Sequence, residues 1–170
     1  NKFTLAKIQA EIGTFKCPYV GYGRNVLTAM FLESGFDYQL FVDADMEFEP
    51  DVVGRMIIAQ KDAICVPYRK KGLTLIHRKV YEKLIKDNPH LKIKQKEIIS
   101  EKANTYFYNF WDTTFSKDGT WWGEDVNFCN LIRKSGFKFY GIVDGKTTHH
   151  GSYGWTGSLA DGFKKANGKD

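Results

Sequence analysis

The chain has 170 residues, of which 42% are hydrophobic and 26% are charged, and its net charge is +5. This composition is too hydrophobic for a disordered protein, and the length supports one sizeable core, so we predict a single domain over residues 1–170. Lysines concentrate in 83–102 and 164–169, but such runs are typical of solvated helix faces and contain no recognised nucleic-acid-binding motif, so we predict no nucleic-acid partner.

The N-terminal part of the chain alternates predicted helices with a predicted strand. Apolar residues at helical spacing predict helices over 3–15 and 25–34, and a glycine stands near the end of each segment. Residues 38–42 are aromatic, aliphatic and β-branched, which predicts a buried strand, with 46–50 as its exit loop. A third helix is predicted to begin at Pro50, because proline suits the first helical position and an acidic residue follows it.

The middle of the chain is predicted to contain two strands and one helix. The strands are expected at 63–67 and 73–77, where apolar runs are short. A helix is predicted over 78–86, and Asn88-Pro89 would end it. Residues 91–103 combine weak periodicity with many lysines, so we predict a mobile excursion there.

The C-terminal part completes the alternation of helices and strands. An aromatic strand is predicted over 105–111, a helix over 121–134 and a last strand over 137–143. After Gly151 the sequence has little regular pattern, and 158–170 is predicted to be a flexible tail. Because helices and strands interleave, we predict an α/β sandwich around a mostly parallel sheet.

Cysteine usage and hydropathy indicate the compartment. Cys17, Cys65 and Cys129 stand at wide spacings that provide neither a disulfide framework nor a metal-ligand pair. This pattern predicts a reduced, intracellular chain. Apolar runs do not reach the roughly 18 residues of a membrane span, and no signal-peptide pattern is present, so we predict a soluble, cytoplasmic protein without a transmembrane segment.

Two carboxylates, Asp43 and Asp45, follow the predicted strand at 38–42 and are separated by one residue. Open α/β sheets bind their ligands at the carboxyl ends of their strands. Carboxylates this close repel each other unless a cation or a proton separates them, and Glu47 and Glu49 add to the repulsion. The pattern therefore favours a divalent metal, and hard oxygen ligands select magnesium or manganese. The alternative is that both carboxylates cap a turn or the next helix.

Five motifs occur in the order of a known family. They are Arg24-Asn25, Asp43-Ala44-Asp45, residues 72–78, residues 122–129 around Gly123-Glu124-Asp125, and His149-His150-Gly151. In this order they resemble the nucleotide-sugar-dependent glycosyltransferases of the GT-A fold, particularly the small family-2-like enzymes of bacteria, phages and large DNA viruses. The resemblance covers roughly residues 18–157, and for a viral chain it implies the host cytoplasm.

The resemblance implies a GT-A (Rossmann-like) sandwich with a mostly parallel mixed central sheet. In that fold the first strand and its loop hold the nucleotide base, whereas this chain begins in the helix that follows them. Two alternatives stay open: the strand lies upstream of Asn1, or base recognition is reduced.

The implied reaction is metal-dependent transfer of a sugar from a nucleoside-diphosphate sugar, UDP- or GDP-linked, to a hydroxyl of a carbohydrate acceptor. A divalent ion, Mn²⁺ or Mg²⁺, would absorb the charge that grows on the leaving diphosphate. By resemblance Asp45 is a direct metal ligand, Asp43 reaches the ribose or a metal-bound water, and His149 is the third protein ligand, with His150 as the alternate. A nitrogen ligand tilts the choice toward manganese. The alternative for both histidines is an ordinary structural role near a strand end.

Further residues are implied in donor binding. Arg24 would fork onto phosphate, and Asn25 would offer its amide to the ribose or the Asp43 region. A helix N-cap is the alternative for Asn25. Tyr153 and Trp155 would close over the diphosphate after Gly151, where the backbone can pass close to a phosphate, although both rings could equally be packing. Lys146 could also neutralise phosphate, but a solvated loop lysine is the commoner meaning.

The predicted acceptor contacts come from residues 121–125, at the start of the predicted helix over 121–134. The resemblance assigns the general base to Asp125, with Glu124 holding an acceptor hydroxyl, and the two roles are exchangeable. Trp121 and Trp122 would stack on the acceptor's apolar face or pack in the core. The alternative for both carboxylates is complementing the positive helix end.

No covalent nucleophile is evident, which favours direct, inverting displacement. Two other functions compete: a non-catalytic nucleotide-sugar or glycan-binding module on the same fold, and a metal-dependent phosphohydrolase. The second would need more clustered Asp or His ligands than the sequence contains.

Overall fold

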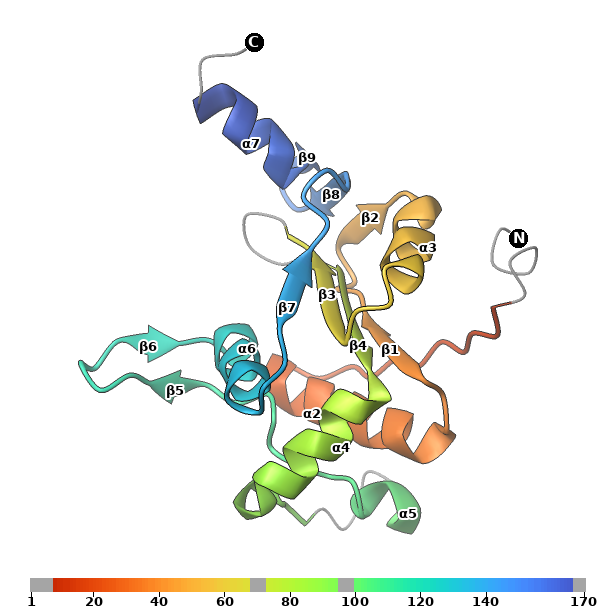
Figure 1. Cartoon of the computed structure of the whole chain (residues 1–170), viewed down its shortest axis with the longest axis vertical. Helices are drawn as coiled ribbons and strands as arrows, with labels where there is room; N and C mark the ends of the chain where they lie inside the picture. Colours follow the sequence, from red (N-terminus) through yellow and green to blue (C-terminus); the bar gives the residue numbers. More distant parts are fainter. Residues whose placement is uncertain (1–7, 68–72, 95–99, 167–170) are drawn as a thin grey trace. The chain divides into compact units, whose positions relative to one another are not determined.

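The computed structural model of the chain describes residues 8–67, 73–94 and 100–166 (Figure 1). They form two compact units, each built from two separate stretches of sequence: unit 1 comprises 1–37 and 78–136, and unit 2 comprises 38–77 and 137–170. No single cut in the chain therefore separates the two units. The class of the protein is α/β with a mixed sheet.

Unit 2 contains a four-stranded sheet in the order β1-β4-β3-β7. Its strands are β1 (Tyr38–Phe41), β3 (Ala63–Val66), β4 (Leu73–His77) and β7 (Phe139–Gly141). The β1–β4 and β3–β4 pairs are antiparallel, and only β3–β7 is parallel, so the prediction of a mostly parallel sheet is wrong. The stretch between β3 and β4 is too short for the crossover that a parallel pair needs, which explains the antiparallel pairing.

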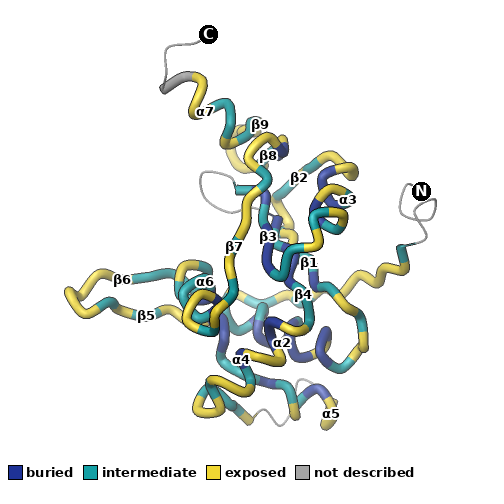
Figure 2. The backbone as a smooth tube through the Cα atoms, in the orientation of Figure 1, coloured by how far each residue is buried: buried dark blue, intermediate teal, exposed yellow. Residues whose placement is uncertain are grey.

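The core of unit 2 forms where β3 and β4 bury their apolar residues (Figure 2). Helix α3 (Pro50–Ile58) contributes Val52, Val53 and Met56, which are all buried. It begins at Pro50 with Asp51 in its first turn, so the predicted start is confirmed. The predicted strands at 63–67 and 73–77 are also confirmed. Short apolar runs of this kind can be recognised in the sequence without knowledge of the partner strands.

A second, antiparallel sheet of unit 2 was not foreseen. It consists of β2 (Met46–Phe48), β8 (Thr147–His150) and β9 (Gly154–Gly157), with β8 in the middle, and helix α7 (Leu159–Ala166) follows it. The exit loop predicted at 46–50 and the absence of regular structure predicted after Gly151 are therefore wrong, and most of the predicted tail is helical. These strands are too short to show an alternating pattern, and their formation depends on partners distant in sequence.

Unit 1 is mainly helical. Its helices are α2 (Val20–Ser34), α4 (Arg78–Asp87), the short 3-10 helix η1 (Pro89–Leu91), α5 (Glu101–Asn104) and α6 (Glu124–Lys134). A two-stranded hairpin, β5 (Thr114–Phe115) and β6 (Trp121–Trp122), precedes α6 (Figure 1). The helix predicted over 78–86 is confirmed. Residues 95–99, within the predicted excursion, lie outside the described residues, as does Gly72.

Aromatic residues fill the core of unit 1. Tyr81 stacks on Phe128 with ring centroids 5.8 Å apart, and Trp111 stacks on Phe128 at 3.7 Å. Phe107 and Phe110 are also fully buried. The strand predicted over 105–111 is wrong: this segment makes one isolated bridge, between Tyr108 and Lys92, and its large side chains serve packing. Aromatic residues favour strands only where a partner strand is present.

Helix α2 begins at Val20, five positions before the predicted start. Its first turn contains Gly21, where a Cβ would lie 2.1 Å from the carbonyl oxygen of Trp111. Glycine weakens the helical pattern locally, but here it allows the helix to contact the Trp111 backbone. Residues 8–15 are not helical, so the predicted helix over 3–15 is wrong there, while 3–7 lie outside the described residues.

The loop that precedes β8 is fixed to α3. Arg55 on α3 donates to Asp144 at 2.6 Å, and this hydrogen bond holds the pKa of Asp144 below its usual value. Because the pKa is lower in the folded chain, the contact stabilises at neutral pH and is lost as pH falls through the lowered pKa. At Gly145 a Cβ would lie 2.7 Å from Val66 Cγ1 and 3.0 Å from Val52 Cγ2.

We expect Gly145→Ala to lower the free energy of unfolding by about 1–3 kcal/mol, because the added methyl group overpacks the contact of α3 with β3. Urea denaturation followed by circular dichroism measures the change. Gly54→Ala on α3 is the matched control, since nothing lies within 4 Å of its added Cβ, and it should be neutral or stabilising. Equal stability of Gly145→Ala and the wild type would contradict the close packing.

Candidate functional site

The predicted acidic motif forms a tight turn between β1 and β2. The backbone N–H of Met46 donates to the carbonyl oxygen of Asp43 at 3.1 Å, which closes the turn over Ala44 and Asp45. Aspartate is common at the first position of such turns. The bond that closes this turn is made by the Asp43 backbone, so it does not test the alternative that the Asp43 carboxylate caps a turn or a helix. A role of Asp43 toward ribose or metal-bound water stays a prediction.

Pairing of β2 with β8 brings Asp45 and His149 together. The backbone N–H of His150 donates to the carbonyl oxygen of Asp45 at 2.8 Å, and Met46 lies opposite His149. As a result, Asp45 Oδ2 and His149 Nε2 are 3.0 Å apart, with 50% and 27% of their side chains exposed. The structure therefore joins two of the predicted metal ligands at a surface that solutes can reach.

His150 makes a separate pair with Glu47. Its Nε2 lies 2.9 Å from Glu47 Oε2, and both side chains are exposed. Neighbouring residues in a strand face opposite sides, which explains why His149 and His150 have different carboxylate partners. Of the two histidines, His149 is the one whose imidazole contacts the Asp-x-Asp motif.

The Asp45–His149 pair fits part of a divalent-metal site. Two ligands in adjacent octahedral positions about 2.1 Å from an ion lie about 3.0 Å apart, which matches the observed separation. One oxygen and one nitrogen donor suit manganese. Within the described residues, no group of three His, Cys, Asp or Glu could hold an ion. The pair would therefore depend on oxygens of a bound substrate or water for the remaining coordination.

We expect His149→Ala to weaken Mn²⁺ binding by at least about tenfold, measured by calorimetric titration in the presence of a nucleoside diphosphate. His150→Ala is the matched control, because it removes an adjacent imidazole from the same strand together with its contact to Glu47. It should bind Mn²⁺ like the wild type. A larger loss in His150→Ala would assign the metal to that histidine.

Of the two predicted diphosphate-covering aromatics, Trp155 lies beside the same pair. Trp155 on β9 lies opposite His149 on β8, and Tyr153 is in the turn that joins these strands. That turn is closed by the N–H of Gly151, which donates to the Tyr153 carbonyl at 3.1 Å. Both rings are exposed, so neither is part of the unit 2 core. Lys146 is exposed just before β8, as a solvated loop lysine would be.

In unit 1, Arg24 and Glu124 form a mostly buried ion pair. Arg24 Nη1 lies 3.4 Å from Glu124 Oε1, and their side chains are 12% and 16% exposed. The guanidinium also lies over the Trp111 ring, 5.0 Å from its centroid. Glu124 stands in the first turn of α6, where a negative charge is favourable. Binding of phosphate by Arg24 stays a prediction.

Asn25 is buried inside α2 and bonds within unit 1. Its amide nitrogen donates to Asn109 Oδ1 at 2.9 Å, and its Oδ1 accepts from the Trp111 backbone N–H at 3.0 Å. The N-cap of α2 is Tyr19, so the N-cap alternative for Asn25 is wrong. These bonds give Asn25 a structural function that holds the Asn109–Trp111 segment, and its predicted contact with ribose is untested.

Asp125 is the second residue of α6. Its Oδ1 accepts a hydrogen bond from the Val126 backbone N–H at 2.7 Å, a contact on the exposed surface.

Burial raises the pKa of the Cys129 thiol, and the negative charge of Asp125 raises it further. Cys129 is therefore a neutral thiol near pH 7, and a neutral thiol is a poor nucleophile.

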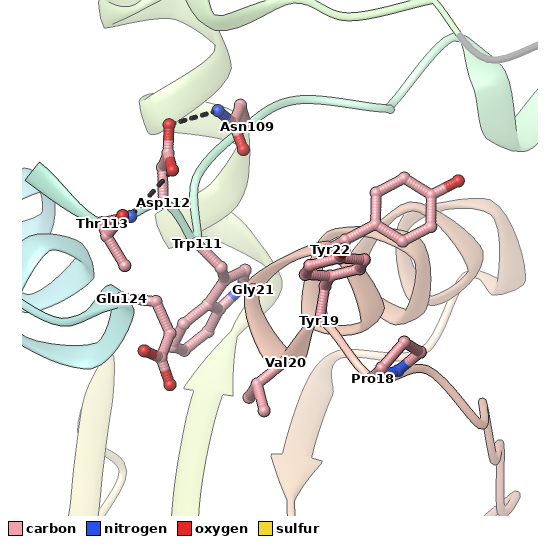
Figure 3. A pocket seen from close by; sticks show the side chains of 10 residues that line it. All are labelled: Pro18, Tyr19, Val20, Gly21, Tyr22, Asn109, Trp111, Asp112, Thr113 and Glu124. Atoms are coloured by element: carbon pink, nitrogen blue, oxygen red, sulfur yellow. Dashed lines mark hydrogen bonds between the residues drawn. The ribbon is translucent and has the colours of Figure 1, made fainter.

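A hollow of about 520 Å³ lies beside the N-terminus of α2, within unit 1. Its lining residues come from α2, the preceding turn, the 109–113 segment and α6: Pro18, Tyr19, Val20, Gly21, Tyr22, Asn109, Trp111, Asp112, Thr113 and Glu124. Figure 3 shows the Glu124 carboxylate beside the Trp111 indole. Asp112 accepts from Asn109 Nδ2 at 2.7 Å and from the Thr113 N–H at 2.8 Å, which orders this wall.

Sequence reasoning missed Asn109, Trp111 and Asp112 as parts of this hollow. Asn109 and Trp111 lie in the predicted strand over 105–111, where a polar residue looks like an outward-facing position of a sheet, and Asp112 directly follows it. The Asn-x-x-Asp spacing was the available signal, since such side chains often bond within a loop.

Comparison of the chain with protein-family models, with curated proteins and with solved structures found no match. Among the helices that the structure describes, none is long and apolar enough to cross a membrane.

Proposed function

We propose that this chain is a metal-dependent glycosyltransferase that moves a sugar from a UDP- or GDP-linked donor to a hydroxyl of a carbohydrate acceptor. The observation that carries the proposal is the Asp45–His149 pair, which joins an oxygen and a nitrogen donor from distant segments at 3.0 Å. The mixed-sheet α/β architecture is compatible with the GT-A fold that the ordered motifs imply.

We assign the donor and the metal to residues of the β2–β8–β9 sheet and of the turn that precedes β2. Asp45 and His149 would hold Mn²⁺ or Mg²⁺, Asp43 would reach the ribose or a water on the ion, and the exposed rings of Tyr153 and Trp155 would cover the diphosphate. When bound, the ion offsets the negative charge that grows on the leaving diphosphate. The exposure of Asp45 and His149 supports this assignment, because a donor has to reach them.

We assign the acceptor to Glu124 and Asp125, the first two residues of α6. Asp125 takes the proton from the attacking hydroxyl as that oxygen bonds to the anomeric carbon and the nucleoside diphosphate leaves. Between the two neighbouring carboxylates, Asp125 is preferred as the base because Glu124 is paired with Arg24 at 3.4 Å and is mostly buried. Glu124 then orients the acceptor at the edge of the hollow that it lines.

A non-catalytic module that binds a nucleotide sugar is the second candidate function. It is favoured by one observation, namely that Glu124, one of the two candidate bases, is mostly buried and already paired with Arg24. A module of this kind would bind the donor without breaking its glycosidic bond to phosphate.

Calorimetric titration of the full chain with UDP, GDP and their hexose derivatives, with and without Mn²⁺, tests the proposal. We expect one nucleotide to bind, and its affinity to depend on Mn²⁺. The same titrations with Mg²⁺ determine which ion is preferred. Absence of binding by every nucleotide in the presence of either ion would contradict the proposed function.

A further inference from the structure

The β5–β6 hairpin of unit 1 presents an unusual aromatic face. Phe115 and Trp121 are directly opposed across its two strands, and they are 70% and 60% exposed. Ser116 N–H donates to the Thr120 carbonyl at 2.8 Å, which makes Phe115 and Trp121 the next, non-hydrogen-bonded pair, where side chains approach closely. Figure 2 shows the hairpin without buried residues. Two large rings therefore form one solvent-facing apolar surface.

Only one of the two predicted tryptophans belongs to this face. Trp122 pairs with Thr114 and is only partly exposed. Since successive strand residues face opposite sides, Trp122 points away from the Phe115–Trp121 face. Phe115, which the sequence did not single out, takes the second position instead.

The aromatic face is continuous with a carboxylate. A Cβ at Gly123 would lie 3.6 Å from Trp121 Cη2 and 3.2 Å from Asp125 Oδ1. The edge of the indole ring and the carboxylate thus flank the same glycine, which connects β6 with α6. An apolar plane beside a hydrogen-bond acceptor matches a pyranose ring, whose C–H face stacks on aromatic rings while its hydroxyls donate to carboxylates.

We propose that Phe115 and Trp121 form a stacking platform for a pyranose ring of the acceptor, with Asp125 accepting a hydrogen bond from one of its hydroxyls. This inference extends the proposed function and rests on it, because the bound sugar is an acceptor only if the chain is a glycosyltransferase. The occupant is a saccharide rather than a second copy of the chain, because the carboxylate of Asp125 beside the rings suits hydroxyls and would be costly to cover with apolar surface.

Ligand-observed NMR titration with methyl α- and β-glycosides of glucose, galactose and mannose tests the platform. At least one glycoside should bind the wild type, and Phe115→Ala and Trp121→Ala should each weaken it about three- to tenfold, as expected for loss of one aromatic stacking contact. Trp121→Phe should retain most of the affinity. Phe163→Ala, which removes an exposed ring on α7, is the matched control and should change nothing.

Three results would overturn the platform. They are the absence of glycoside binding to the wild type, equal binding by all variants, and a concentration-dependent dimer that Phe115→Ala dissociates in sedimentation experiments. The titration contains neither metal nor nucleotide, so it is independent of the donor experiment. Glycoside binding without donor binding would contradict the transferase and support the platform, and the reverse would contradict only the platform.

Discussion

Asp45→Ala is expected to abolish metal-dependent donor binding. Asp45 is the carboxylate that lies 3.0 Å from His149, so its removal leaves the imidazole as the sole member of the pair. The affinity for the nucleotide in the presence of Mn²⁺ should fall by more than about 100-fold, since even outer partners of metal ligands contribute about 10- to 100-fold. Calorimetric titration with the nucleotide that binds the wild type measures the loss.

Glu47→Ala is the matched control for this variant. It removes an exposed carboxylate from β2, the strand that follows the Asp-x-Asp turn, together with the His150 contact at 2.9 Å, but leaves Asp45 and His149 in place. We expect its Mn²⁺-dependent affinity to equal that of the wild type. Unchanged affinity in Asp45→Ala would show that the metal does not bind at the Asp-x-Asp turn.

Asp125→Asn should retain donor binding while turnover falls by about 100-fold or more, because the amide cannot take the proton from the acceptor hydroxyl. The change is nearly isosteric, and the amide oxygen can still accept from the Val126 N–H. Release of nucleoside diphosphate in the presence of acceptor measures turnover, and calorimetry measures donor binding. Both readouts are needed, because only a loss confined to turnover identifies a base.

The control for Asp125→Asn is Asp87→Asn on α4, which changes an exposed carboxylate of the same unit that is paired with Lys83. Its turnover should equal that of the wild type. If turnover is retained in Asp125→Asn but lost in Glu124→Gln, then Glu124 is the general base and Asp125 holds the acceptor hydroxyl. Because Glu124 is also bonded to Arg24, circular dichroism should accompany that variant.

Local sequence signals predicted the elements whose stability is local. Helix α3 begins with proline and buries one face, and β3 and β4 are short apolar runs, so each could be identified without its partners. The strands of the second sheet could not, because β2 and β9 exist through their pairing with β8. The 105–111 segment was misinterpreted for the related reason that its aromatic side chains pack in the core of unit 1.

For the candidate site, the sequence indicated which residues could bind a cation, but it did not indicate which side chains they contact. Two carboxylates after a strand indicated a cation, and the structure places one of them against His149. The resemblance favoured His149 over His150 as the metal ligand, which stays a prediction. Which imidazole lies against Asp45 depends on strand register, which adjacent residues in a sequence do not reveal. Asn25 was misplaced at a helix start because Gly21 and Gly23 weakened the pattern of the first turn of α2.

The most direct test of the central claim is detection of the transferred sugar. The full chain would be incubated with Mn²⁺, UDP- and GDP-linked hexoses and the methyl glycosides, and the products analysed by mass spectrometry. We predict a disaccharide glycoside together with an equal amount of nucleoside diphosphate, both lost on chelation of the metal. Metal-dependent donor binding without either product would contradict the transferase and identify a nucleotide-sugar-binding module.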